Sequence, residues 1–456
     1  MRIPPALYQD SLGLDPRSLA LLRIFAGFLF LGVRLINLPY VTEFYSDAGQ
    51  LPRSVLWTAG KESSGRLFSV FFWTGSEPLV WLLYGLSIAC AIALIVGWKT
   101  RWMTLACWAF AFSLYCRNPY INPASDYQLQ LCFLWGFFMP WGAFWSWDAR
   151  GASPPSTPYV SLATVAWRIQ VVVMYMGASL AKTTSHWAQG TAVEVSLMSD
   201  TWGSPAGKWL AQQCLQHPGT LELVNEAVIW GEFFIPPLML LPFWRLQLTV
   251  LLTLCGLHLA FGTFLHIEAF SVVSIGLLVG FLPRQAWQGL SGLQKRLNRT
   301  FKSLGPPATL AKPGPVASAA VTWMLGLALW SNLDTVNLSP IRLTPRAQDI
   351  FGHLGLSQGW MMFAPPPHKG GWYVFRGQTL QGDWVNLLLG GQDPGLETPL
   401  DTSQTVATTR HYLFYNARLR SDPALSSNHR ALAQHLQTRW ERRHPDAQAR
   451  LTRVEL

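Results

Sequence analysis

Long apolar segments separated by short polar loops are the feature that most constrains how this chain can fold. Nine segments can be marked, at residues 19–36, 78–98, 102–116, 127–147, 160–182, 223–243, 246–264, 267–283 and 316–333. A segment of about 20 apolar residues is long enough to cross a bilayer as a helix. Charged residues make up 13% of the chain, whereas they make up about a quarter of a soluble protein. The sequence therefore predicts an all-α multi-pass membrane bundle of about nine transmembrane helices.

The charges of the loops predict how this bundle is oriented. Residues 284–315 carry no acid and six basic side chains, which are Arg284, Lys295, Arg296, Arg299, Lys302 and Lys312. Loops rich in Lys and Arg stay in the cytoplasm. We therefore expect a transmembrane domain over residues 1–290, a basic cytoplasmic loop over 291–315 and a last membrane helix over 316–333. Alternation across nine spans places the N-terminus in the cytoplasm and residues 334–456 outside.

The residues after 333 have a different character from the rest of the chain. The stretch "GWYVFRGQTLQGDWVNLLLGG" predicts two strands around a Gly-Asp turn. The stretch "SNHRALAQHLQTRWERRHP" predicts a helix, and "RLTRVEL" alternates as an edge strand does. These elements indicate a small C-terminal α+β domain outside the membrane. The connecting stretch "LGLSQGWMMFAPPPHKGGW" is expected either to lie on the bilayer surface or to cap the bundle.

A lysine at the end of the fifth apolar segment allows two interpretations. Lys182 could be an anchor whose amine reaches water, or it could be turned into the bundle. Residues 177–181, "GASLA", are mostly small, and small residues allow close helix packing, which favours the inward orientation. Tyr175 lies seven residues before Lys182, nearly two helical turns, so both belong to one face.

Other polar residues belong to the same outer half of the predicted bundle. His258, Gly262 and His266 recur every four residues in the seventh segment, although a single buried His is more often a core group than a ligand. Carboxylates expected near this half are Asp47, Asp126, Glu226, Glu232 and Glu268. Asp126 has a plain alternative role as a helix cap. The simplest common account is an outward-opening cavity that Lys182, Asp126, His258 and His266 line. A lysine buried there could act as a base.

The same residues carry a family resemblance that covers roughly residues 11–290. It rests on "LDPRSLALLRIFAGFLFL", "YSDAGQLPRSVL", "SDYQLQLCFLWGFFMPWGAFWSWD", "GASLAKTTSHWAQGTAV" and "LHLAFGTFLHIEAFS". With these motifs the chain resembles bacterial members of the horizontally transferred transmembrane domain (HTTM) family, which is similar to the vitamin K-dependent gamma-carboxylase. The resemblance implies a helical bundle in the bacterial inner membrane with an extracytoplasmic C-terminal part.

The resemblance also implies chemistry. In the carboxylase a lysine five residues before a tryptophan deprotonates reduced vitamin K, which oxygen converts to an epoxide, and carbon dioxide then adds to a protein glutamate. Lys182 and Trp187 match that pair, and His258 matches a histidine of the corresponding helix. The resemblance thus implies Lys182, His258 and Asp126 as catalytic residues. Tyr175, Trp187 and His266 would contact reduced vitamin K or another quinol.

One departure from the carboxylase pattern concerns the residues that support the lysine. Where the carboxylase has an Asn-His pair, this chain reads "PASDYQLQ", with Asp126 close to that place. An Asp beside Lys182 would hold the amine charged and weaken it as a base. The C-terminal part is also far shorter than that of the carboxylase. The resemblance therefore favours a quinone-like pocket more than it favours glutamate carboxylation.

Two non-catalytic functions stay open beside this one. The chain could be a transporter or lipid-binding protein whose polar residues bind a substrate, or a membrane anchor for the outer domain or a protein partner. Motifs of hydrolases, zinc peptidases and nucleotide-binding enzymes are absent from the sequence, and we expect neither a metal nor a nucleic-acid partner. Cys116 and Cys214 are expected on the same outer side, where a disulfide between them would be allowed.

Overall fold

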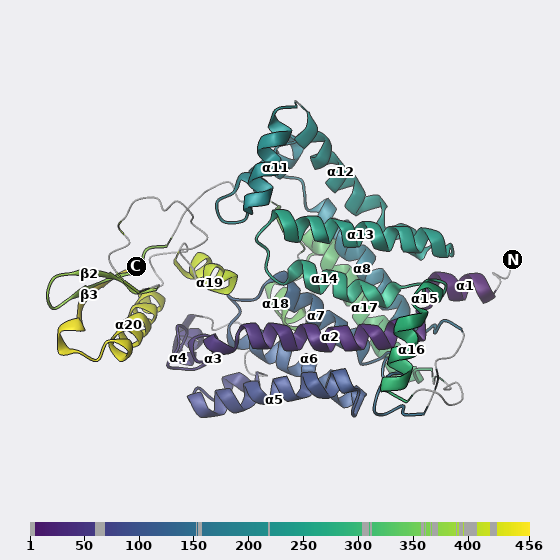
Figure 1. The fold of residues 1–456 in the computed structure, drawn as a ribbon, viewed down its shortest axis with the longest axis horizontal. Helices are drawn as coiled ribbons and strands as arrows, with labels where there is room; N and C mark the ends of the chain where they lie inside the picture. The colour runs from purple at the N-terminus through teal and green to yellow at the C-terminus, as the bar shows by residue number, and fades with distance from the viewer. Residues whose placement is uncertain are drawn as a thin grey trace.

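The computed structural model describes most of the chain as a helical bundle with a small sheet at one end (Figure 1). It covers residues 5–456 except 60–68, 152, 154–156, 218, 303–309, 311, 357–359, 361, 365, 367–372, 389, 392–394, 396–407 and 420–425. Residues 303–309 and 311 of the predicted basic loop therefore lie outside the described residues.

Six helices in the described part of the chain are long and apolar enough to cross a membrane. They are α2 (Pro16–Ile36), α5 (Glu77–Val96), α8 (Leu162–Leu180), α12 (Thr220–Phe234) with the 3-10 turn η4 (Pro236–Leu240), α13 (Trp244–Phe264) and α17 (Pro315–Thr335). The other three predicted spans correspond to α6 (Thr100–Arg117), α7 (Ala124–Gly136) and α14 (Phe270–Leu278), which are shorter or less apolar. The bundle of membrane helices is confirmed, and the count of nine is not.

Local sequence signals explain where the helices that build the site begin and end. Ser161 and Thr164 form a capping box at the start of α8, in which each side chain bonds the backbone of the other. Helix α13 ends at Phe264, and Leu265 has an extended backbone, so the chain leaves the helix axis there. Helix α8 packs against α7, α12 and α17, while α13 packs against α14. The main core lies between these helices and α2.

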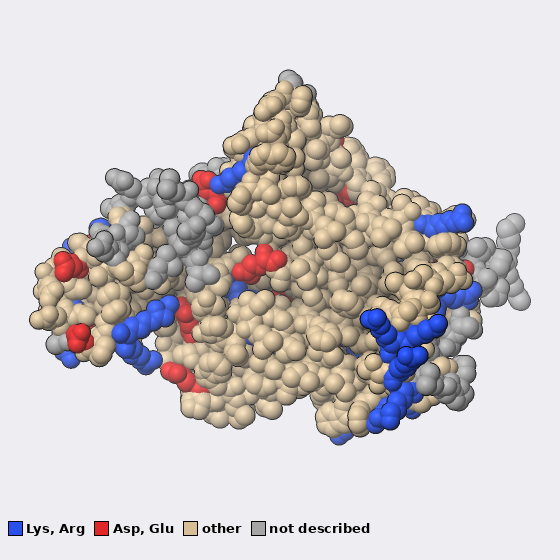
Figure 2. Space-filling model, viewed as in Figure 1, with Lys and Arg blue, Asp and Glu red and all other residues tan. Residues whose placement is uncertain are grey.

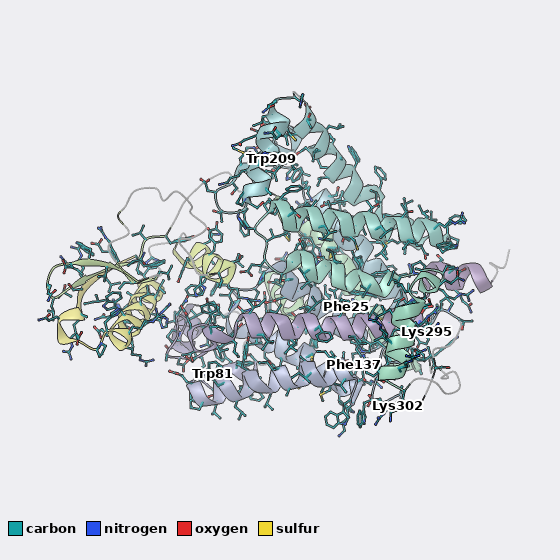
Figure 3. The ribbon with its side chains drawn as sticks, viewed as in Figure 1. Phe25, Trp81, Phe137, Trp209, Lys295 and Lys302 are labelled. Carbon is teal, nitrogen blue, oxygen red and sulfur yellow. The ribbon has the colours of Figure 1, made fainter. Side chains whose placement is uncertain are left out.

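Shorter helices connect the spans. They are α1 (Pro5–Leu12), η1 (Leu38–Tyr40), α3 (Val41–Tyr45), α4 (Arg53–Ala59), η3 (Val70–Phe72), α9 (Ser185–Ala188), α10 (Ala192–Met198), α11 (Pro205–Leu215), η5 (Val279–Phe281), α15 (Ala286–Gly289), α16 (Ser291–Thr300) and α18 (Pro345–Leu354). Lys and Arg side chains gather over α16, at the end of the bundle opposite the sheet (Figures 1 and 2). Lys295 and Lys302 belong to this end (Figure 3).

The C-terminal residues form the predicted small α+β unit. Strands β1 (Arg376–Thr379), β2 (Trp384–Asn386) and β3 (Leu451–Glu455) make an antiparallel sheet in the order β2-β1-β3, with helices α19 (Thr409–Leu419) and α20 (Ser426–Arg443) and the turn η8 (Ala447–Ala449) beside it. The predicted hairpin is β1–β2, and the predicted edge strand is β3. Helix α19 was not predicted. Cys116 and Cys214 are not joined by a disulfide.

Buried ion pairs join this C-terminal unit to the bundle. Arg410 of α19 pairs with Asp126 of α7, with 2.8 Å between guanidinium nitrogen and carboxylate oxygen. The Glu43 carboxylate of α3 lies 3.3 Å from a guanidinium nitrogen of Arg439 in α20. The same carboxylate lies 3.3 Å from His411 Nε2 in α19. The unit is therefore tied to the bundle at two places by charged side chains, in addition to the apolar residues they share in one core cluster.

Candidate functional site

A cavity of about 270 Å³ lies between α8, α12 and α13. Its walls are almost entirely apolar, and the chemistry-bearing side chains among them are Tyr175, Lys182, Glu232 and His258. Trp360, Met362 and Phe363, from the stretch between the last membrane helix and the sheet, close one side of the cavity. A mostly apolar cavity with a few convergent polar groups is the usual form of a small-molecule site.

Lys182 is turned into this cavity. Helix α8 ends at Leu180, and the Lys182 side chain is 6% exposed. Its amine forms an ion pair with Glu232 of α12, and it also donates a hydrogen bond to the Ala178 carbonyl at 3.1 Å. The amine lies 5.3 Å from the centre of the Trp187 ring, within the range of a cation–π contact. The inward alternative thus holds for Lys182, and its charge partner is Glu232.

The close approach of α8 and α12 explains how this ion pair forms. The Ser179 hydroxyl donates a hydrogen bond to the Ile229 carbonyl of α12 at 2.9 Å. Such a contact requires small side chains at the interface, and the stretch "GASLA" supplies them. A narrow end of α8 therefore brings Lys182 within reach of a carboxylate on the neighbouring helix.

A second polar pair lies on the cavity wall between α8 and α13. The Tyr175 hydroxyl and His258 Nε2 are 2.7 Å apart, and both residues are buried. The rings of Phe261 and Phe270 lie edge-on to the His258 ring. Among the described residues, His258 Nδ1 has no hydrogen-bond partner although it is buried. A buried imidazole nitrogen of this kind is suited to receive a polar group of a ligand.

Trp187 connects the cavity to the segment that closes it. Its indole N–H donates to the Phe363 carbonyl at 2.7 Å, and its own carbonyl accepts from Asn225 of α12 at 3.1 Å. Phe363 has a φ of 55°, which is uncommon for a residue other than glycine and indicates that the surroundings hold this turn in place. Of the two expectations for this stretch, the structure agrees with the cap on the bundle.

A smaller cavity of about 20 Å³ adjoins the larger one behind Tyr175 and Met174, which line both. Gln128 of α7 faces it and accepts a hydrogen bond from the Ser274 hydroxyl of α14 at 3.0 Å. This volume suits about one water molecule. Gln128 and Ser274 are therefore further polar side chains next to the site, on the far side of Tyr175.

Asp126 is not among the residues that line the cavity, and its predicted place beside Lys182 is wrong. It lies in the first turn of α7, where its carboxylate pairs with Arg410 of the C-terminal unit. The spacing of "PASDYQLQ" gives no information on which side of α7 faces α8. Because Arg410 is buried, it requires a charge partner, and Asp126 supplies it.

His266 also lies outside the cavity lining. The spacing of four residues from His258 through Gly262 holds only while the helix continues, and α13 ends at Phe264. His266 is exposed, and its backbone N–H donates to the Trp202 carbonyl at 2.7 Å. Of the predicted site residues, the structure brings together Lys182, Tyr175, Trp187 and His258, and it separates Asp126 and His266 from them.

Sequence reasoning missed two parts of the site. Glu232 is one of five carboxylates that the sequence places near the outer half, and its spacing from Lys182 carries no signal because Lys182 follows α8 whereas Glu232 lies on α12. Trp360 and Phe363 come from beyond the last span, and only the unusual density of aromatic residues in "GWMMF" pointed to them. Among the described residues, no cluster of three or more His, Cys, Asp or Glu side chains could hold a metal ion.

Comparison with known proteins gives one match. A family model described as "HTTM domain" matches residues 13–287, a range that includes Lys182, Trp187, Glu232 and His258 but not the segment around Trp360. No curated protein and no solved structure matches the chain.

Proposed function

Because the chain belongs to the HTTM domain family, and is an integral membrane protein with several membrane-spanning helices, we propose that it binds a quinol-type molecule in the cavity beside Lys182 and acts on it with Lys182 as the base. The observation that carries this proposal is the position of the Lys182 amine. It lines an apolar cavity, is almost fully buried, and faces a wall that bears the Tyr175–His258 pair.

The residues present fit a quinol. The walls offer aromatic and aliphatic surface for a ring, and His258 Nδ1 is a buried polar atom without a partner among the described residues. Molecular oxygen would oxidise a reduced quinone to its epoxide, with one oxygen atom entering the ring and the other leaving as water together with the two hydroxyl protons. Lys182 would accept one of these hydroxyl protons at Nζ while Glu232 holds the proton that the pair shares, because a proton can move between a buried amine and a carboxylate without leaving an isolated charge. His258 and Tyr175 would orient the oxygen of the ring.

The pairing of Lys182 with Glu232 supports a second candidate function. A lysine whose charge is already compensated is a weaker base than a free buried amine. The same cavity would then bind a lipid without transforming it, as a carrier or a regulated binding protein does. This candidate uses the same apolar walls but requires no proton transfer at Lys182.

The test is the conversion of reduced naphthoquinone to its epoxide by protein in membranes supplied with oxygen. We expect epoxide from the unaltered protein and at least about a 100-fold loss in Lys182→Met, since a positioned base contributes about 10² to 10⁴ in rate. Lys208→Met is the matched control, because Lys208 is more exposed and pairs with Asp200 on the surface. No epoxide from the unaltered protein with several naphthoquinols and benzoquinols would reject catalysis. A lipid that co-purifies with that protein, but not with a cavity-filling variant such as Ala178→Trp, would then support the second candidate.

The orientation of the bundle is part of the proposal. The Lys and Arg side chains over α16 and the C-terminal sheet lie at opposite ends of the molecule (Figures 1 and 2). The positive-inside rule then supports a cytoplasmic α16 and an extracytoplasmic sheet. Cysteine introduced at Lys295 or at exposed Leu380 and labelled with a membrane-impermeant maleimide tests this, and labelling at Lys295 in intact cells would reverse the orientation.

A further inference from the structure

Helices α12 and α13 form a wedge with the cavity behind it. They are joined by η4 at one end, and α11 contacts both of them at the other end, where they diverge (Figure 1). Between these limits α12 contributes Val224, Val228 and Glu232 to the cavity lining, and α13 contributes Leu257, His258, Ala260, Phe261 and Phe264. Apart from Glu232 and His258, which belong to the polar groups of the site, the lining that the two helices contribute is apolar.

The outer faces of these two helices are also apolar. Val224 lines the cavity and is 40% exposed. Leu223 of α12 is 71% exposed, and Leu259 of α13 is 61% exposed. Trp209 of α11, also exposed, lies above the open end of the wedge (Figure 3). Both helices are apolar enough to span the membrane, so these outer faces meet lipid.

On these grounds we infer that the cavity is loaded sideways from the bilayer, through the window between α12 and α13, by a molecule that carries a long hydrocarbon tail. This inference rests on the proposed function for the nature of the head group and adds the tail and the route. The polar groups that would receive a head, Lys182, Glu232 and His258, lie on the cavity lining. The window itself offers only apolar contacts, so the tail would lie between Val228 and Phe261 and end in the lipid.

The size of the cavity agrees with a head group that lies inside it and a tail that lies outside it. About 270 Å³ lies just below the range of roughly 300–1,000 Å³ for small-molecule sites, which is enough for a ring system but too small for a ring with several isoprenoid units. A tailed ligand can therefore be accommodated only if its tail leaves the cavity. The lipid-facing window provides that exit, and no charged or hydrogen-bonding group has to be desolvated along it.

Photolabelling in nanodiscs tests the route without reference to catalysis. The probe is a naphthoquinone with a four-isoprene tail that carries a diazirine on the isoprene unit next to the ring, and mass spectrometry locates the labelled residues. We expect label on α12 and α13 around Val224 and Leu257, with at least about a tenfold loss in Val224→Trp or Val228→Trp, whose indole would fill the window. Leu223→Trp is the control, because Leu223 is the adjacent residue of α12 but does not line the cavity.

The outcomes separate this inference from the proposed function. Labelling that is blocked by Val224→Trp, in a protein that forms no epoxide, would support the window and reject catalysis. Labelling of the same intensity in Val224→Trp, Val228→Trp and Leu223→Trp would overturn the window. Equal epoxide formation from tailed naphthoquinol and from tailless menadiol, unaffected by either Trp variant at the window, would overturn it while leaving the proposed function in place.

Discussion

The Tyr175 hydroxyl of α8 and the His258 Nε2 atom of α13 lie 2.7 Å apart, inside the bundle and on the wall of the cavity that Lys182 enters. This hydrogen bond joins two membrane helices. It engages Nε2, so Nδ1 is the ring nitrogen of His258 that has no hydrogen-bond partner among the described residues.

Replacing Tyr175 by Phe should weaken both stability and ligand binding. The change removes the hydroxyl and leaves a buried His258 nitrogen unpaired, at a cost of about 1–3 kcal/mol. Thermal unfolding in detergent measures the stability, and retention of a bound quinone measures the binding. Tyr120→Phe is the comparison, since Tyr120 lies outside the cavity lining. Equal behaviour of the two variants would contradict a role for the pair in orienting His258.

Replacing Glu232 by Leu should destabilise the protein by about 3–5 kcal/mol, because it leaves the Lys182 charge buried without a partner. The double variant Lys182→Met/Glu232→Leu should recover most of this loss, since both charges are then gone. The free energy of unfolding in a denaturant series checks both values. Asp200→Leu, which breaks the more exposed pair with Lys208, should cost no more than about 1 kcal/mol. A double variant as unstable as Glu232→Leu would show that the pair is not the cause.

Acid should weaken the attachment of the C-terminal unit through Glu43. Burial alone would raise the pKa of this carboxyl, but the nearby imidazoles of His411 and His435 and the charge of Arg439 outweigh it and hold the pKa far below its usual range. A carboxyl with a depressed pKa stabilises the fold fully above its unfolded pKa of about 4.3, and the stabilisation is lost as the pH falls below that value. Glu43→Gln should therefore unfold at a lower temperature than the unaltered protein at pH 6–7.

Measurements over a range of pH provide the control for the Glu43→Gln prediction. The difference in unfolding temperature between Glu43→Gln and the unaltered protein should shrink between about pH 5 and pH 3, where the unfolded carboxyl becomes protonated. Glu441→Gln serves as the matched variant on α20, because Glu441 is not among the partners of Glu43. A difference that stays constant over the whole range would contradict the assignment to the Glu43 carboxylate.

Replacing Asp126 by Asn should lower the stability of the protein but leave its quinone binding and any activity nearly unchanged. Arg410 keeps its bond to the Ile121 carbonyl at 3.0 Å but loses its charge partner, so we expect about 2–4 kcal/mol of destabilisation and easier proteolysis of the C-terminal unit. Quinone binding and any epoxide formation should remain within about twofold at a temperature where the variant is folded. A loss of activity as deep as that of Lys182→Met would return Asp126 to the catalytic site.

The parts of this molecule that the sequence predicted well are those that depend on neighbours along the chain. Apolar length located the helices, and the alternation in "RLTRVEL" located the edge strand. The count of nine spans is not confirmed, because α14 is apolar but short, α7 is short and α6 is less apolar, and the hydropathy of a segment does not give the length of its helix.

Contacts between helices could not be predicted in the same way. Which carboxylate reaches Lys182 depends on how far each helix is rotated about its axis. This rotation is fixed by packing, such as the bond from Ser179 to Ile229, and no spacing in the sequence encodes it. The sequence predicts Asp126 beside Lys182 only because Asp126 matches a position in the carboxylase pattern. In the structure its partner is Arg410, almost 300 residues later in the chain.

The bond from the Trp187 indole to the Phe363 carbonyl has a consequence for how such proteins diversify. The family match ends at residue 287, yet Trp360, Met362 and Phe363, far beyond it, complete the wall around Lys182. Two proteins could share the same membrane helices and the same lysine and still accept different molecules, if the segment after the last span that closes the cavity differs between them. Sorting these proteins by the residues after that span, instead of by the helices, should then group together those with a common ligand.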